Sequence, residues 1–198
     1  MEMSRLQRTY VNRPKNADKK IYFLDTLIDG IEMKGIEKAL EVGCGPGYLS
    51  KHMNEAYKVE VIGTDVDPIE IEFAKRSAAA AKGLTFIVAD STRLPFDDDE
   101  FDMVVSHMVL HHIKEWQTTI GEIARVVRPG GYYLFHDLTY SRLLTALFKP
   151  VMKSHSFYTI EEIGSCLASD GFEKIHELNP GTYYLRQFTE YNIGFQKT

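Results

Sequence analysis

The sequence predicts an α/β fold in which a mostly parallel β-sheet is covered by helices on both faces. Short apolar runs typical of buried strands alternate with helical patterns of about 10–15 residues, as expected for strand–helix–strand units. A glycine-rich run, Glu41 to Gly47, lies between the first strand and the helix that follows it. The chain has 198 residues, 44% of them hydrophobic, which is enough for one buried core and short for two.

An amphipathic helix is expected ahead of the first strand. Within residues 18–28 the apolar side chains recur at helical spacing, and Gly30 ends the pattern. Pro68 suits the first turn of a later helix, which Gly83 closes. The other expected elements, in chain order, are a strand at 39–40, a helix at 48–56, a strand at 59–64, a helix at 68–81, strands at 84–89 and 101–106, a helix at 115–127 and a strand at 132–136.

The C-terminal part of the chain changes character. Thr159 and Glu162 have the spacing of a capping box, which predicts the start of a helix. Two strand-like runs follow, at 172–178 and 182–189, and a turn signal at 179–181 separates them. We therefore expect an antiparallel hairpin at the edge of the sheet.

The charge of the chain argues against a nucleic-acid substrate. The net charge is −5, so no general basic field would attract phosphates. The first 20 residues nevertheless hold six Lys or Arg and only two acidic residues. We predict that residues 1–35 form an N-terminal helical or lid segment packed on the domain made by residues 36–198. A solvated terminus and a lid that closes over an anionic substrate are both compatible with this basic start.

The cysteines and the start of the chain indicate the compartment. Cys44 and Cys166 lack the spacing of a metal site and are expected to be free thiols. The first residues have no apolar segment of a signal peptide, and no run approaches the roughly 18 apolar residues of a membrane span. We expect a cytoplasmic protein without a membrane span, either a monomer or a homodimer.

The glycine-rich run predicts a cofactor site and the kind of cofactor. Its glycines, Gly43, Gly45 and Gly47, have the spacing G-x-G-x-G, whereas a dinucleotide fingerprint would need a glycine where Tyr48 stands. Glu41, at the head of the run, would repel a pyrophosphate by about 2–4 kcal/mol at roughly 4–8 Å and a dielectric constant near 20. The pattern therefore favours a positively charged cofactor without phosphate, and S-adenosylmethionine fits.

From this run onward the chain resembles the class I S-adenosylmethionine-dependent methyltransferases, in particular their small-molecule branch of ubiquinone and menaquinone methyltransferases. The resemblance implies a Rossmann-like, doubly wound, seven-stranded sheet that is mostly parallel and has an antiparallel strand near the C-terminus. It also implies S-adenosylmethionine as the cofactor, S-adenosylhomocysteine as the product and a small molecule as the methyl acceptor.

Acidic residues at the next two strand ends extend the predicted cofactor site. Asp65 ends the second strand, 18 residues beyond Gly47, where a carboxylate can accept both ribose hydroxyls. Val66 follows it and is included in the site. Asp67 is expected to cap the helix that begins at Pro68. Asp65 by itself would not distinguish S-adenosylmethionine from a nicotinamide cofactor.

The resemblance supplies the remaining cofactor contacts. It implies that Asp90, at the end of the third strand, accepts a hydrogen bond from the adenine amino group and that the backbone amide of Ser91 contacts the ring. Ser106, at the end of the fourth strand, is expected beside the methionine end of the cofactor. The acidic run at 97–100 lacks the glycine and the spacing of a calcium loop, so we expect a solvated loop there.

Histidines near the ends of the fourth and fifth strands are candidates for acceptor chemistry. His111 and His136 are predicted as general bases because histidine titrates near neutrality, and His107 is a further candidate. A structural role stays open for each of them. A metal site is not expected, because His111 and His112 are adjacent and point in different directions and no cysteine or carboxylate completes a set. One set of aromatic residues could wall an acceptor pocket or simply pack in the core: Tyr10, Tyr132, Tyr133, Phe157 and Tyr158.

Four functions are compatible with these motifs, and a small-molecule methyltransferase leads because little chain is left over for a substrate domain. A catalytically silent protein that binds S-adenosylmethionine would carry the same motifs. A nicotinamide-dependent oxidoreductase is disfavoured by the loop spacing and by Glu41. A protein or RNA methyltransferase is disfavoured by charge, and residues 106–109 lack the Asn/Asp-Pro-Pro-Tyr pattern that marks amino-group methylation in related enzymes. An oxygen, carbon or sulfur acceptor is therefore favoured.

Overall fold

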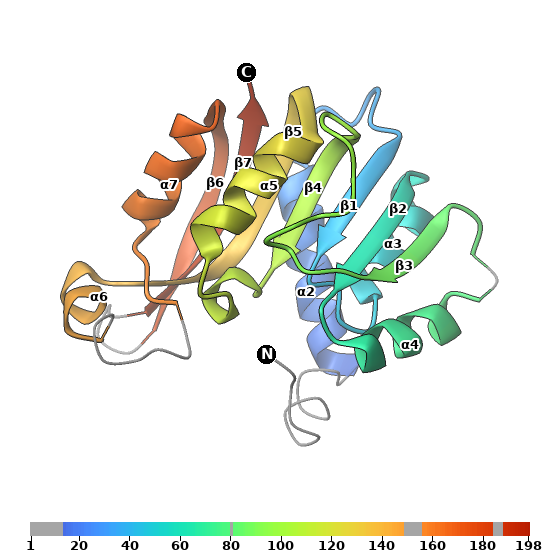
Figure 1. Ribbon diagram of the computed structural model, residues 1–198, viewed down its shortest axis with the longest axis horizontal. Coiled ribbons are helices and arrows are strands. Elements are labelled where there is room, and N and C mark those ends of the chain that lie inside the picture. Colours follow the sequence, from blue (N-terminus) through green and yellow to red (C-terminus); the bar gives the residue numbers. More distant parts are fainter. Residues whose placement is uncertain (1–13, 80, 149–155, 184–187) are drawn as a thin grey trace.

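The computed structural model describes residues 14–79, 81–148, 156–183 and 188–198. A seven-stranded sheet with the order β3-β2-β1-β4-β5-β7-β6 runs through the molecule (Figure 1). Strands β1 to β5 are parallel, and β7 is antiparallel to both of its neighbours, β5 and β6. The predicted fold class is therefore confirmed. The strands are β1 (Lys38–Val42), β2 (Glu60–Asp65), β3 (Leu84–Val88), β4 (Phe101–His107), β5 (Val127–Tyr140), β6 (Phe172–Tyr183) and β7 (Phe188–Lys197).

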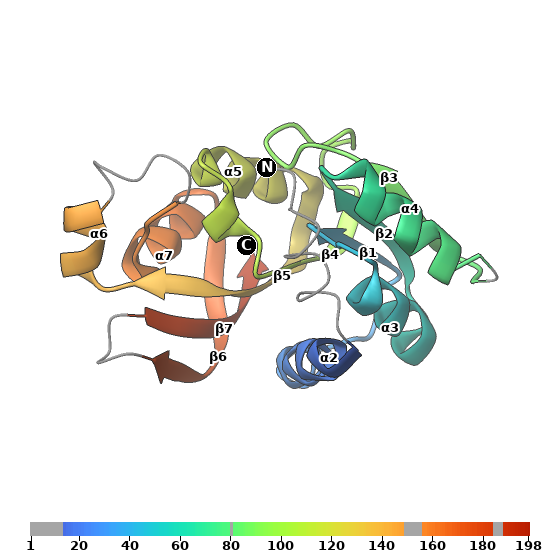
Figure 2. The same cartoon turned by 90° about the horizontal axis from the view of Figure 1, so that it is seen from below.

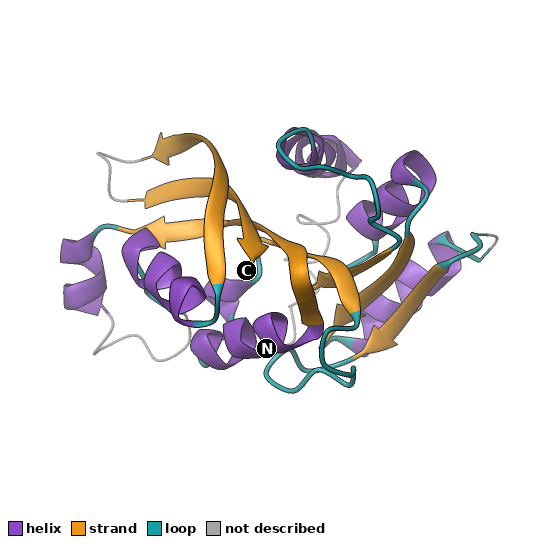
Figure 3. Ribbon diagram, turned by 90° about the horizontal axis from the view of Figure 1, so that it is seen from above, coloured by secondary structure: helices purple, strands orange, loops and turns teal. Residues whose placement is uncertain are grey.

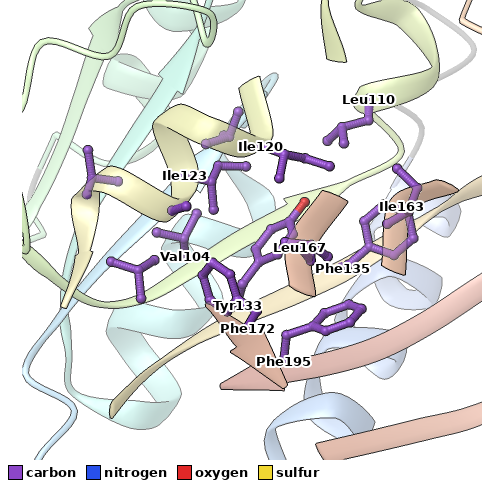
Figure 4. Packing of buried hydrophobic residues seen from close by; sticks show 14 of the residues in the cluster. Val104, Leu110, Ile120, Ile123, Tyr133, Phe135, Ile163, Leu167, Phe172 and Phe195 are labelled. Atoms are coloured by element: carbon purple, nitrogen blue, oxygen red, sulfur yellow. The ribbon is translucent and has the colours of Figure 1, made fainter. Parts of the chain in front are cut away.

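Helices cover both faces of this sheet (Figures 2 and 3). On one face, side chains of α5 and α7 pack on β4 to β7 around Tyr133, Phe135 and Phe195 (Figure 4). On the other, Leu24 and Leu27 of α2 join residues of α3 and the central strands in a second cluster. The helices are α2 (Pro14–Ile28), α3 (Tyr48–Tyr57), α4 (Pro68–Ser77), α5 (Trp116–Val126), α6 (Arg142–Phe148) and α7 (Ile160–Ser169), with a 3₁₀ turn η1 (Leu110–His112).

The strand order reverses between β1 and β4, which fixes where a ligand can bind. The connection after β1 leads away to β2 on one side, and β4 pairs with β1 on the other, so the loops at their carboxyl ends diverge. In open α/β sheets the ligand crevice lies at this point. Val42 pairs with Ser106 at the end of this pair of strands, so the glycine-rich loop and the loop after β4 lie side by side.

The predicted position of the C-terminal hairpin is wrong. Strand β6 runs through the expected turn at 179–181 and ends at Tyr183, with a register shift between Leu178 and Gly181, and β7 begins at Phe188. β6 is an edge strand, where Pro180 can be accommodated at a bulge because only one side of the strand must be hydrogen-bonded. The connection at 184–187 lies outside the described residues.

Three other boundaries differ from the sequence-based expectation. β5 begins at Val127 and continues to Tyr140, whereas the strand was expected at 132–136, so residues 128–131 form part of the strand, with Gly130 at φ 78°. α4 ends at Ser77, whose hydroxyl donates to the carbonyl of Ala74, a bond that competes with the helical pattern. The start of α2 at Pro14 and the helix α6 were not foreseen.

Both predicted helix caps are present. The hydroxyl of Thr159 accepts from the backbone N–H of Glu162, and the Glu162 carboxylate accepts from the backbone N–H of Thr159, which is the reciprocal pairing of a capping box. Asp67 accepts from the backbone N–H of Ile69 at 2.9 Å and so caps α4. Local side-chain chemistry thus starts α4 and α7 as the sequence indicates.

Candidate cofactor and acceptor site

The three glycines after β1 are required by the shape of the loop. Gly43, Gly45 and Gly47 have φ values of 71°, 52° and 78°, all in the left-handed region. A Cβ atom on Gly43 would lie 2.4 Å from a methyl carbon of Val109, and one on Gly47 would lie 2.5 Å from the ring of Phe86. The loop is therefore pressed against the loop after β4 on one side and against β3 on the other.

The middle glycine faces open space bordered by carboxylates. The nearest atom to a Cβ built on Gly45 is a carboxylate oxygen of Glu70 at 4.0 Å. Glu70 is fully buried in the first turn of α4, and Asp65 and Glu41 end the neighbouring strands. Bare backbone beside buried acids accommodates the cationic methionine end of S-adenosylmethionine better than a pyrophosphate, so the residues present fit this cofactor.

Glu41 is held in place by α3 and is a weak acid in this position. Its carboxylate accepts hydrogen bonds from the backbone N–H of Ser50, at 2.7 Å, and from the Ser50 hydroxyl. Burial raises the pKa of Glu41 to about 7, although the Ser50 hydrogen bonds and the charge of Lys20 act in the opposite direction. Glu41 is therefore only partly ionised near neutral pH, and its repulsion of a pyrophosphate is correspondingly weaker than predicted. A bound cation would favour the ionised form.

Asp65 braces the loop as well as facing the site. One of its oxygens accepts from the backbone N–H of Gly45 and the other from that of Asp67, both at 2.9 Å. Burial raises the pKa of Asp65, and these backbone hydrogen bonds limit the rise. The bond to Gly45 was not foreseen, because it joins residues 20 positions apart. Val66 follows with half of its side chain exposed, and the ribose role of Asp65 stays a prediction.

The other predicted cofactor contacts lie at the ends of β3 and β4. Asp90 is exposed and accepts from the backbone N–H and hydroxyl of Thr92, at 2.9 and 2.8 Å, which lowers its pKa. The hydroxyl of Ser91 is 3.2 Å from that of Thr119 in α5. Asp90 thus follows the strand that pairs with the one ending at Asp65, and its adenine role stays a prediction.

Ser106 is fully buried, and its hydroxyl lies 2.7 Å from the hydroxyl of Tyr133. This places the side chain in the core beneath α5, so a contact with the cofactor would have to come from the backbone of Ser106. Tyr133 and Tyr158 are core residues rather than exposed pocket walls. Tyr10 lies outside the described residues.

His111 forms a pair with a buried aspartate. Its Nδ1 lies 2.5 Å from a carboxylate oxygen of Asp137, in the second half of β5. The other oxygen of Asp137 accepts from the backbone N–H groups of Val109 and Leu110, at 3.0 and 2.6 Å. The pairing fixes Nδ1 as the nitrogen that faces Asp137 and leaves Nε2 as the nitrogen available to another group.

His107 and His136 form a second group, because their positions pair across β4 and β5. Their rings stack with centroids 4.2 Å apart, and Phe23 of α2 contacts the His136 ring edge-on at 4.6 Å. Both ring nitrogens of His107 are buried without a hydrogen-bond partner among the described residues. Burial, followed by the influence of His136 and Lys20, places the pKa of His107 well below its usual value. His107 is therefore neutral at physiological pH.

The two predicted general bases thus occupy different surroundings, one paired with a carboxylate and one stacked in an aromatic group. Sequence reasoning missed two further charged groups near the glycine-rich loop, Lys20 and Glu70. Lys20 was counted with the basic residues at the start of the chain, and Glu70 was not singled out. Within the described ranges, no three His, Cys, Asp or Glu side chains gather as a metal site. No helix among the described residues has the length and apolar character needed to cross a bilayer.

Comparison with known proteins agrees with the arrangement of the site. Residues 40–135 match the model of a methyltransferase domain family. The malonyl-[acyl-carrier protein] O-methyltransferase of Legionella pneumophila is 29% identical over 145 residues, 68% of this chain and 50% of that protein. Phosphoethanolamine N-methyltransferase 3 of Arabidopsis thaliana is 29% identical over 152 residues, which are 75% of this chain and 31% of that protein. The fatty-acid O-methyltransferase of Mycolicibacterium smegmatis is 35% identical over 102 residues, covering 51% and 37%.

Solved structures agree on the fold. The PH0226 protein of Pyrococcus horikoshii superposes with a TM-score of 0.75 at 23% identity, covering 95% of this chain and 93% of that one. The [4+2]-cyclase SpnF superposes at 0.74 with 17% identity, over 89% and 80%. This neighbour is a cyclase, so the fold alone does not define the reaction.

The chain spans half or less of the length of these curated relatives. Their names do not single out the quinone branch, which stays a prediction. The glycine-rich loop at the switch point, the acids around it and the matched family model together identify residues 40–135 as a methyltransferase domain of the class I type, whose cofactor is S-adenosylmethionine.

Proposed function

We propose that the chain is an active methyltransferase that transfers the methyl group of S-adenosylmethionine in line to a small-molecule acceptor. The observation that carries the proposal is the group of acids around the bare backbone of Gly45 at the β1–β4 switch point, the buried Glu41 and Glu70 and the half-buried Asp65. When bound, the cofactor supplies an activated methyl group on a sulfonium. The residues of the chain bind the reactants, align them and exclude water.

Each cofactor residue has a role that follows from its position. The glycine-rich loop lets the methionine end approach bare backbone, and Glu41 and Glu70 provide negative charge beside it. Asp65 accepts the ribose hydroxyls while its bond to Gly45 keeps the loop in shape. At the end of β3, Asp90 and the backbone of Ser91 take the adenine ring.

His111 is proposed as the general base for acceptors that must lose a proton. Asp137 holds its Nδ1, so Nε2 can accept a proton while the carboxylate stabilises the resulting imidazolium. His136 is retained as a second candidate, although its ring packing between Phe23 and His107 also suits a wall of the acceptor pocket. A His111→Gln change should slow the methylation of a hydroxyl acceptor without altering cofactor affinity.

A small acceptor is supported by the acidic net charge and by the names of relatives that act on acyl and amino compounds. A silent S-adenosylmethionine-binding protein is the alternative. It stays open because the fold does not by itself imply methyl transfer: the cyclase neighbour has the same fold and a different reaction. The cytoplasmic location and the monomeric or homodimeric state stay part of the proposal.

Titration calorimetry with S-adenosylmethionine, S-adenosylhomocysteine and NAD tests the cofactor assignment. We expect the first two to bind and NAD not to bind. Asp65→Asn should weaken S-adenosylhomocysteine binding by about 1–3 kcal/mol, because a charged acceptor of hydroxyl hydrogens is lost. Asp97→Asn, in the exposed acidic loop, is the matched control and should change nothing. Binding without any turnover on a panel of phenols, thiols, acids and amines would favour the silent alternative.

A further inference from the structure

Lys20 is a charged residue on the buried face of α2. Ala17, Leu24 and Leu27 are buried and stand three residues before, four after and seven after Lys20. Residues at these spacings share one face of a helix. Lys20 is itself half-buried, so its side chain runs from α2 towards the sheet rather than away into solvent.

The charge of Lys20 interacts with acidic groups and with a histidine. Glu41 of β1, Asp65 of β2 and Glu70 of α4 act on its charge from the cofactor side, together with the Cys44 thiol. The charge of Lys20 also lowers the pKa of His107, the last residue of β4. Burial lowers the pKa of Lys20, and the three carboxylates oppose that change. Phe23, three residues after Lys20 in α2, contacts the ring of His136, which stacks on His107. Lys20 therefore stands on the part of α2 that faces the carboxyl end of β4.

The end of β4 has the features of a ligand contact. Both ring nitrogens of His107 are shielded from solvent and have no hydrogen-bond partner in the described part of the chain. Buried polar atoms are rarely left in this state without a ligand or water to satisfy them. A neutral imidazole can donate one hydrogen bond and accept another.

The backbone next to His107 holds it against the cofactor loop. Met108 has φ 56°, an uncommon value for a residue with a side chain, and its N–H donates to the carbonyl of His136 at 2.7 Å. The next residue, Val109, fills the space above Gly43. Backbone of this kind clusters at ligand sites. His107 thus stands where a methyl acceptor must approach the cofactor.

We propose that Lys20 and His107 bind the methyl acceptor and that this acceptor is an acid, a carboxylate or an acidic phenol or enol, which is methylated on oxygen. The inference rests on the proposed function and narrows its substrate class. Glu41 and Glu70 face the cationic end of the cofactor, which leaves the Lys20 ammonium to attract the oxyanion. The His107 N–H donates a hydrogen bond to the oxyanion. A cationic amine in the same place would face Lys20 with like charge.

The chemistry of an ionised acceptor needs no base. The bond between the methyl carbon and sulfur breaks, its electron pair stays on sulfur to give a neutral thioether, and a new carbon–oxygen bond cancels the charge of the oxyanion. An acceptor that arrives protonated must first give its proton to His111. Carboxylate methylation should therefore tolerate His111→Gln at pH 7. Methylation of an ordinary phenol, which is protonated at this pH, should not tolerate it.

Calorimetry on the protein saturated with S-adenosylhomocysteine tests the inference without turnover. The probes are two matched pairs, octanoate with octylamine and benzoate with benzylamine. We expect at least one acid to bind ten or more times as tightly as its paired amine. Lys20→Met, which keeps the length and apolar stem of the side chain, should remove this preference. Lys20→Arg should keep most of it, and Lys75→Met, on the exposed face of α4, should leave it unchanged.

The same titrations separate the competing explanations. The affinity of S-adenosylhomocysteine should stay within twofold in Lys20→Met. If it falls as much as acid binding does, Lys20 serves the cofactor and the inference is wrong. Equal binding of acids and amines, or binding of neither acid, also overturns it. Failure of the unchanged protein to bind S-adenosylhomocysteine would instead contradict the proposed function.

His107 needs its own variant, because a loss in Lys20→Met could arise from charge alone. His107→Leu removes both ring nitrogens and keeps an apolar filling, so acid binding should fall by at least fivefold while the melting temperature is maintained or rises. Recovery of binding in His107→Gln, which restores a donor, would support a hydrogen bond to the acceptor. Unchanged acid affinity in His107→Leu would show that the ring only packs against His136.

Discussion

The two sides of the β1–β4 crevice are built by different means. On the β1 side, the glycine-rich loop, Glu41 and Ser50 lie within one short strand–turn–helix segment. On the β4 side, His111 meets Asp137 and His107 meets His136 only because β4 and β5 pair in parallel. The cofactor side is therefore specified locally, and the acceptor side is specified by long-range packing. A family can keep one side and vary the other without changing the fold.

The largest predicted effect is at Gly43, where the two sides touch. Gly43→Ala forces a side chain into the left-handed region and against Val109, so we expect a loss of roughly 2–5 kcal/mol in unfolding free energy. Urea denaturation measures it. Adding Val109→Ala should recover part of the loss, because only the clash is relieved.

Gly121→Ala in α5 is the control for that experiment. Nothing lies within 4 Å of a Cβ at this position and its backbone is helical, so the change should stabilise the protein by about 0.5–1 kcal/mol. If Gly43→Ala were equally harmless, the contact between the two loops would not be the constraint that we describe.

The second prediction concerns the titration of Glu41 on the cofactor side. Its pKa rises from 4.5 to about 7 on folding, so the folded state binds the proton more tightly than the unfolded state. Stability should therefore fall as pH rises from about 4.5 to 7, by at most about 3 kcal/mol relative to Glu41→Gln. Denaturation at several pH values measures this difference.

Cofactor binding should respond to pH in the opposite sense. A cationic ligand favours the ionised carboxylate, so the affinity for S-adenosylmethionine should rise as pH increases through 7 in the wild type. The Glu41→Gln variant should lack this dependence. A flat profile in both proteins would place the cation away from Glu41.

Asp137 provides the third prediction, on the acceptor side. Asp137→Asn keeps the shape but weakens the bonds to His111 and to two backbone N–H groups, so we expect a loss of about 2 kcal/mol in stability. S-adenosylhomocysteine affinity should stay within twofold, because the contacts of Asp137 are on the acceptor side. A parallel loss of cofactor affinity would show that the two sides are coupled more strongly than their construction suggests.

What could be predicted from the sequence follows the same division. The place of the glycine-rich loop between β1 and α3 and the caps at Asp67 and Thr159 depend on neighbouring residues, and the structure confirms them. The turn at 179–181 was misplaced because a proline followed by a glycine can either end a strand or form a β-bulge in an edge strand. Only the position of β6 at the edge decides between them.

The charged groups of the site show why the rest was out of reach. His111 and Asp137 are 26 residues apart, and no local pattern links them. Lys20 was counted among the solvated basic residues, although it stands on the same stripe as Leu24 and Leu27. A lysine at a buried position of an amphipathic helix can be recognised in the sequence as a candidate site residue. It becomes informative once the acids that it faces are known.

The smallest predicted effect compares the starts of two helices. α7 is capped by its own side chains through Thr159 and Glu162, whereas α3 begins at Gly47 with no side-chain cap from that residue. Thr159→Ala should cost about 1 kcal/mol in thermal or urea unfolding and leave S-adenosylhomocysteine affinity unchanged. A helix that serves only the fold can complete its own first turn. The start of α3 instead depends on Glu41 from β1, so a change there should alter stability and cofactor affinity together.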